Sequence, residues 1–136
     1  MEDEIKKLIN YHQQLTAAAV KTSEIILAAA MSGDLNTITT ETKNRHRLFE
    51  VLNTLQTKIQ ICGQSFEDKK VFREEILPII NLWAQDFYNW SEQINHIDQQ
   101  IIDVLAKQKE QVSQSLAMLF GQKKKFQGYN LSSTKK

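Results

Sequence analysis

The second half of the chain carries one long amphipathic pattern. Between Phe72 and Phe120, large apolar residues recur mostly at steps of three or four positions. This spacing places them on one face of an α-helix. At ~1.5 Å per residue, a helix of about fifty residues is roughly 75 Å long. A compact small domain cannot enclose such a helix, so we expect it to extend past its neighbours.

Pro78 lies inside this long pattern. Its ring nitrogen cannot donate the helical hydrogen bond to the carbonyl of Glu74. The apolar stripe keeps its phase across Pro78, so we expect a kink in the helix and not a break. A break would instead leave a short helix over 66–77 and a long helix over 79–120.

Two shorter amphipathic patterns precede it, over residues 3–31 and 35–61. Between them, Gly33 fits the left-handed position that ends a helix, with Leu35 as its apolar contact. Asp34 is a favourable N-cap for the next helix. A connection this short predicts an antiparallel hairpin. Together with the long helix, this gives an all-α fold, an antiparallel three-helix bundle without strands.

The expected domain covers residues 1–121 and is followed by a flexible basic tail over 122–136. Gly63 is predicted to end the second helix, and Gly121 to release the chain from the third. Residues 121–136 contain five Lys and no acid, a charge of +5, so the +1 of the whole chain leaves −4 on the body. A weakly acidic body therefore precedes a basic tail.

Composition excludes several classes of protein. Four Gly and one Pro are too few to interrupt long helices often. A net charge of +1 creates no overall field for nucleic acid, and five tail Lys are a small footprint for phosphates. The single Cys62 excludes an internal disulfide, and the acidic start at Glu2 is unlike a secretory signal. No apolar run approaches the ~18 residues of a membrane span. We therefore expect a cytoplasmic protein with neither nucleic-acid binding nor membrane insertion.

Catalytic, cofactor and metal sites are not expected. Glu92 with His96, and His46 with Glu50, lie four residues apart and could share a metal on one helix face. The sequence lacks the paired Glu-x-x-His motifs of di-iron bundles, and zinc sites of the Cys/His kind need more than one Cys. It also lacks a Gly-rich phosphate loop and a nucleophile elbow. A lone Cys62 at the end of an apolar stripe is typical of packing.

Three aromatic residues, Trp83, Phe87 and Trp90, share one face of the long helix. An aromatic cage for a ligand is one interpretation, and the centre of the core is the one that we favour. The residues that we expect to pack against them are Leu15, Ala19, Phe49 and Leu52.

The last part of the long helix carries the candidate partner-binding residues. They are Ile101, Leu105, Val112, Leu116, Leu119 and Phe120. If the two shorter helices end earlier, this stripe has no cover within the chain. An exposed apolar stripe of that size is uncommon on a soluble monomer. We expect either a second copy or a client helix to cover it.

Several short segments carry a resemblance to a known family. They are Ser32-Gly33-Asp34-Leu35, Ile38, Arg45 and Arg47-Leu48 near the first turn, and Lys123-Lys124-Lys125 with Gly128-Tyr129 after the long helix. In these features the chain resembles the cytosolic flagellar type III secretion export chaperones of the FlgN/FliT kind.

The resemblance implies a helical chaperone whose C-terminal helical region binds flagellar hook-associated or filament-cap subunits. Such a chaperone prevents premature assembly and delivers its client to the export apparatus. In that family a tyrosine near the C-terminus helps docking on the export gate, and Tyr129 is the matching residue. Two hypotheses stay open: an export chaperone, or a self-associating helical adaptor whose C-terminal stripe is buried in a homodimer.

Overall fold

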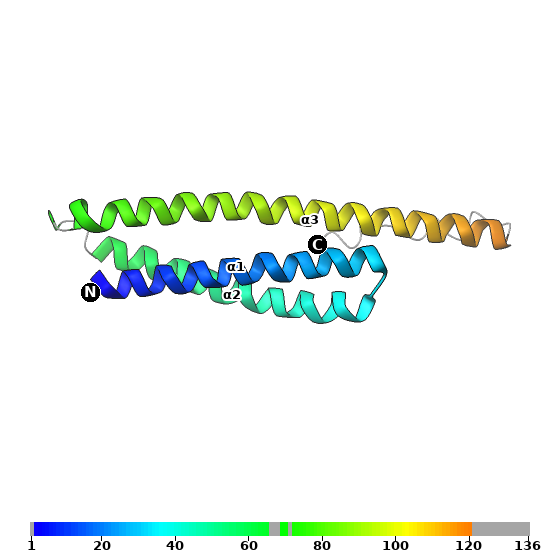
Figure 1. Cartoon of the computed structure of the whole chain (residues 1–136), viewed down its shortest axis with the longest axis horizontal. Coiled ribbons are helices and arrows are strands. Elements are labelled where there is room, and N and C mark those ends of the chain that lie inside the picture. Colours follow the sequence, from blue (N-terminus) through cyan, green and yellow to red (C-terminus); the bar gives the residue numbers. More distant parts are fainter. Residues whose placement is uncertain (1, 66–68, 71, 121–136) are drawn as a thin grey trace.

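Three long helices make up the fold. The computed structural model describes residues 2–65, 69–70 and 72–120. Helices α1 (Glu2–Ser32) and α2 (Leu35–Ser65) form a hairpin, and the π-helical turn η1 (Phe72–Ile76) leads into α3 (Leu77–Phe120). Within these described ranges there is no strand, and the expected all-α bundle is confirmed. In Figure 1, α3 lies along the hairpin and extends past its turn.

The turn between α1 and α2 forms as the sequence predicts. Gly33 has a φ of 74°, in the left-handed region. Glycine adopts this conformation without the steric penalty that a Cβ atom would bring. The amide of Asp34 donates to the carbonyl of Ala29 at 2.9 Å, and the amide of Gly33 donates to Ala30 at 3.3 Å. These two bonds define a Schellman motif. The expected apolar contact of Leu35 was wrong, because that side chain is exposed.

Asp34 caps the start of α2. Its Oδ1 accepts from the amide of Thr37 at 3.1 Å, and its Oδ2 accepts from the Thr37 hydroxyl at 2.6 Å. Both bonds favour the ionised carboxylate and lower the pKa of Asp34. The predicted N-cap is therefore confirmed.

The prediction that Gly63 ends the second helix was wrong. α2 continues to Ser65, and Gly63 is buried inside it. A Cβ atom at this position would lie 3.1 Å from Cδ1 of Ile80 in α3. The absence of a side chain at Gly63 thus leaves room for the Ile80 side chain against the backbone of α2, which is a tertiary role and not a local stop.

Pro78 does not break the third helix. The turn η1 passes directly into α3, in which Pro78 is the second residue. A π-helical turn shifts the hydrogen bonds by one residue, so the missing N–H of proline falls where the pattern already changes. The accommodation is therefore a change of helical winding just before Pro78.

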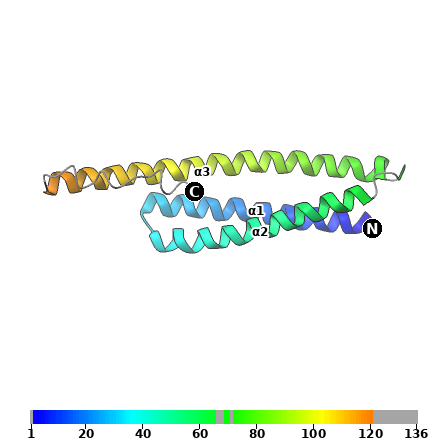
Figure 2. The same ribbon diagram turned by 180° about the vertical axis from the view of Figure 1, so that it is seen from behind.

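α1 is the central element of the packing. It packs along much of its length against both α2 and α3, whereas the first half of α2 contributes no buried residue. Figures 1 and 2 show the molecule from opposite sides. In both views α3 runs along α1, and α2 crosses α1 at an angle. One buried cluster joins Ile5, Ile9, Ile59, Ile76 and Trp83, and a second joins Ile26, Ile97 and Ile101.

The expectation that no apolar run approaches the length of a membrane span needs a correction. The segment Asp3–Ser32, in α1, is long and apolar enough, by length and composition alone, to cross a membrane. Core helices of globular proteins meet the same criterion. In this fold α1 buries Ile5, Ile26 and Ala30 against its neighbours, and 28% of the most apolar part of the segment is buried.

Candidate partner-binding surface

Side-chain hydrogen bonds fix the register of α3 on α1. Nε1 of Trp90 donates to the carbonyl of Thr16 at 2.9 Å. Much further along, Nε2 of Gln108 donates to the carbonyl of Ala30 at 2.6 Å. The two helices are therefore parallel, and α3 reaches the end of α1 near Gln108. The apolar stripe of α3 is interrupted at Gln108, and the bond of this polar side chain to α1 accounts for the interruption.

The candidate residues Ile101 and Leu105 belong to the bundle. Ile101 is 8% exposed and packs with Ile26 and Ile97, while the half-buried Leu105 packs against the same cluster. Our placement of Ile101 among residues left uncovered by the hairpin was wrong. α3 follows α1 to its last turn, so the two helices pair over a greater length than the helix lengths alone predict.

The free end of α3 is shorter than expected and still apolar. It comprises residues 109–120, which at ~1.5 Å per residue are about 18 Å long. Val112 is 58% exposed, Met118 is 86% exposed, and Leu116 is half-buried. The side chains of Leu119 and Phe120 lie outside the described residues, as does Tyr129 with the rest of 121–136.

The aromatic residues of α3 form a row on the face toward the hairpin. Trp83 and Phe87 stack with centroids 5.9 Å apart, and Phe87 and Trp90 stack at 5.3 Å. Trp83 is buried and the other two are half-buried. Their predicted core role is confirmed for Trp83. The Trp83 cluster contains Ile5, Ile9, Ile59 and Ile76 and none of the four expected partners. One of those partners, Phe49, does pack on the aromatic row, edge to face against Trp90 at 5.8 Å.

His12 completes this row from α1. It is 1% exposed, and its Nδ1 accepts from Nε1 of Trp83 at 3.1 Å. Tryptophan can only donate, so the His12 ring is neutral with its proton on Nε2. Nε2 is buried and without a hydrogen-bond partner among the described residues. Burial lowers the pKa of His12. The polar pair thus fixes the contact between α1 and α3 at the cost of one unsatisfied donor.

Arg45 joins the middle of α2 to α3. Its guanidinium nitrogens bind the two carboxylate oxygens of Asp98 at 2.5 and 2.7 Å. The guanidinium also lies over the ring of Phe49, 4.7 Å from its centroid, and Phe49 meets Trp90 edge to face. This bidentate, half-buried pair is the strongest kind of side-chain link between two helices.

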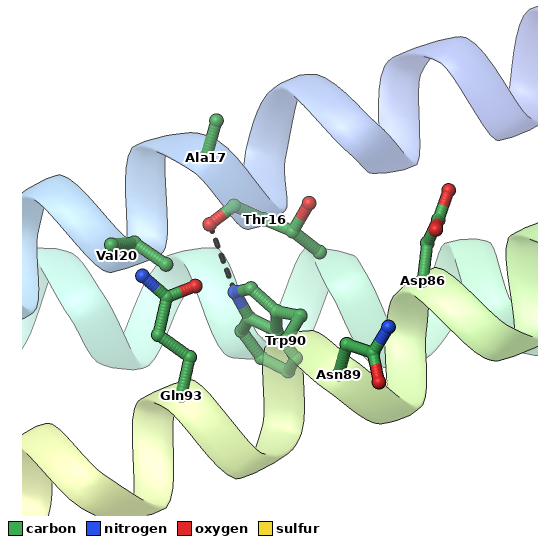
Figure 3. A pocket seen from close by; sticks show the side chains of 7 residues that line it. All are labelled: Thr16, Ala17, Val20, Asp86, Asn89, Trp90 and Gln93. Carbon is green, nitrogen blue, oxygen red and sulfur yellow. Dashed lines mark hydrogen bonds between the residues drawn. The ribbon is translucent and has the colours of Figure 1, made fainter.

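Two open cavities flank Trp90. Figure 3 shows the first, of about 420 Å³, between α1 and α3, with Ala17 on one side and Asn89 and Gln93 on the other. The second, of about 280 Å³, lies between α2 and α3. Among the described residues that line it, Asp98 is the only charged one; the others include Phe49, Asn53, Gln56, Ser91 and Asn95. A groove of this composition suits uncharged side chains of a helix better than a small charged ligand.

The described residues offer little for catalysis. They contain no group of three or more His, Cys, Asp or Glu that could hold a metal ion. His46 lies 2.7 Å from Glu50, at the surface. Burial, with the charge of Glu4, raises the pKa of the Cys62 thiol, which lowers the fraction of reactive thiolate.

Comparison with known proteins leaves the geometry as the basis for function. No family model matches the chain, and neither a curated protein nor a solved structure matches it.

Proposed function

We propose that this protein binds a partner polypeptide through the free end of α3, as a cytoplasmic chaperone does. One observation carries the proposal: α3 continues to Phe120, past Gln108 where it reaches the end of α1, and Val112 and Met118 in this continuation are exposed. Burying each such apolar side chain is worth roughly 1.5–3 kcal/mol. A partner helix that covers the stripe gains this free energy.

The specific client follows from the resemblance to the FlgN/FliT kind of export chaperone. We propose that the client is a flagellar hook-associated or filament-cap subunit, held unassembled until it is delivered to the export gate. A helical hairpin with a protruding third helix supports this role. Tyr129 is the proposed contact with the export gate, and it lies outside the described residues.

Capture from a lysate of flagellated bacteria tests the proposal. The immobilised wild-type chain should retain a hook-associated or cap protein, identified by mass spectrometry. The double variant Val112→Asp with Leu116→Asp should retain less than about a tenth of that amount, because charges in the contact cost more than 1.4 kcal/mol, a factor of ten.

The matched control is Leu82→Asp. Leu82 is 63% exposed on α3, on a different face and within the paired part of the helix. It should capture the client as well as the wild type does. Equal capture by the double variant and the wild type would refute the assignment of the surface, and absence of any flagellar protein would refute the proposed client.

A further inference from the structure

His12 is a titratable side chain enclosed in the contact between α1 and α3. The rings of Trp83 and Phe87 meet it edge to face, with centroids 5.3 and 4.8 Å from its own. Its Nδ1 accepts from the indole N–H of Trp83, and its Nε2 has no hydrogen-bond partner among the described residues. The site is therefore shaped for a neutral ring with a free lone pair on Nδ1.

A second proton on His12 is incompatible with this arrangement. The proton has to enter at Nδ1, because Nε2 already carries the proton of the neutral ring. Nδ1 faces the N–H of Trp83, and tryptophan can donate a hydrogen bond but cannot accept one. Protonation thus breaks the bond to Trp83 and leaves a buried cation, whose Nε2 has no acceptor among the described residues. The charged ring needs water, which it reaches when α1 and α3 separate at this position.

The surroundings of His12 offer no charge to offset that cation. Burial is the cause of its lowered pKa, and no charged side chain among the described residues contributes to the shift. The adjoining apolar cluster has one titratable neighbour, Cys62 of α2, whose pKa is raised by burial and by Glu4, so that the thiol is neutral in acid. On α3, Asp86 is exposed and lines the open cavity at Thr16.

The contact between α1 and α3 has two ends with different chemistry. Trp83 belongs to the buried cluster near the start of α3, and this end contains His12. Towards the hairpin turn, the bond from Trp90 to the carbonyl of Thr16 is followed by a second cluster. That cluster is aliphatic and consists of Ile26, Ile97 and Ile101. A charge on His12 therefore acts on the first end and leaves the second intact.

We infer that His12 is a pH-sensitive switch, whose protonation releases residues 77–89 of α3 from α1 while α3 beyond Trp90 stays attached. The switch combines a buried histidine with an element that is held at two separate places. Its release exposes the rings of Trp83 and Phe87, an apolar surface distinct from the free end of α3. The inference does not depend on the proposed client.

The size of the effect follows from the two forms of the contact. In the open form His12 has its ordinary pKa of about 6.5, and in the closed form Nδ1 holds no proton. The closed contact is therefore most stable above about pH 6.5 and weakens as the pH falls, because only the open form gains the proton. Between about pH 7.5 and about pH 5, the equilibrium constant for opening should rise about 30-fold.

Native-state amide hydrogen exchange at about pH 7.5 and about pH 5 tests the switch, with rates corrected for the intrinsic effect of pH. The opening constant of residues 77–89 should rise about 30-fold, and that of residues 97–105 less than ~3-fold. An equal rise in both segments would mean that acid loosens the whole bundle. That result, or an unchanged opening constant for residues 77–89, would overturn the inference.

His12→Gln is the matched variant. Its amide oxygen can accept from Trp83 in place of Nδ1, and its side chain does not titrate. The opening constant of residues 77–89 should then change less than ~3-fold between the two pH values, and the same holds for His12→Leu. His46 and His96 are exposed and unchanged in both variants, so they serve as an internal reference. A 30-fold rise that persists in either variant, with helix content unchanged by circular dichroism, would assign the acid response to another group.

Discussion

The buried pair of His12 and Trp83 gives the sharpest quantitative prediction. The substitution Trp83→Phe retains an aromatic ring in a position that is buried, and removes the N–H that Nδ1 of His12 accepts. His12 would then hold two ring nitrogens in the interior without a partner, because Nε2 already lacks one among the described residues. We expect a loss of stability well beyond the effect of ring size.

The magnitude has two parts. Leaving a buried acceptor unsatisfied costs about 1–3 kcal/mol. The smaller ring leaves a partial cavity and costs roughly 1–2 kcal/mol, less than half of a complete truncation to alanine. Trp83→Phe should therefore lower the free energy of unfolding by about 2–5 kcal/mol. Domains are commonly stable by about 5–15 kcal/mol, so the variant remains folded and measurable.

A double-mutant cycle separates the two parts. His12→Leu removes the acceptor, so Trp83→Phe in that background retains only the packing cost. Urea unfolding followed by circular dichroism should give a cost at least 1 kcal/mol smaller in the His12→Leu background than in the wild type, on the scale of one hydrogen bond. Trp90→Phe is the matched control. It also removes an indole N–H, but the acceptor of that N–H is the backbone carbonyl of Thr16 in a helix and not a side chain. Equal costs of Trp83→Phe in both backgrounds would refute the account.

Three further outcomes follow from the structure. Burial lowers the pKa of His12 below its usual ~6.5, so the unfolded chain binds the proton first and stability should fall as the pH drops below about 6.5; His12→Leu should remove this part of the slope in urea titrations. Arg45→Ala should cost about 1–2 kcal/mol by leaving the partly exposed Asp98 carboxylate without its bidentate partner, and Arg45→Lys should not restore the loss in thermal unfolding. Gly63→Leu should cost about 1–3 kcal/mol in the same assay, because even its Cβ would lie 3.1 Å from Ile80.

Local signals predicted the helices well. The apolar spacing located three helices, and Gly33 with Asp34 located the turn, because those features act within a few residues of the chain. Gly63 shows the limit of such signals. Its role depends on Ile80, which lies on another helix, so a helix stop and a close helix contact look the same in the sequence.

The candidate surface was only partly predictable. The sequence predicted that α3 extends past its neighbours. The length over which α3 overlaps α1, however, depends on where along α1 the third helix begins. The bond from Gln108 to Ala30 sets that overlap, and it moves Ile101 into the core. The groove beside Trp90 could not be foreseen either, because it depends on the angle at which α2 crosses α1.

The first half of α2 has a consequence for slow motion. Its buried residues begin only at Leu52, so residues 35–44 are attached mainly by the cap at Asp34 and by partly buried contacts. The pair Arg45–Asp98 then links α2 to α3. Segments with few buried contacts open at a lower free energy than the whole domain and exchange their amide hydrogens sooner. Residues 35–44 should therefore behave as a separate foldon. This segment opens while the amide hydrogens of α2 after Arg45 stay protected from exchange.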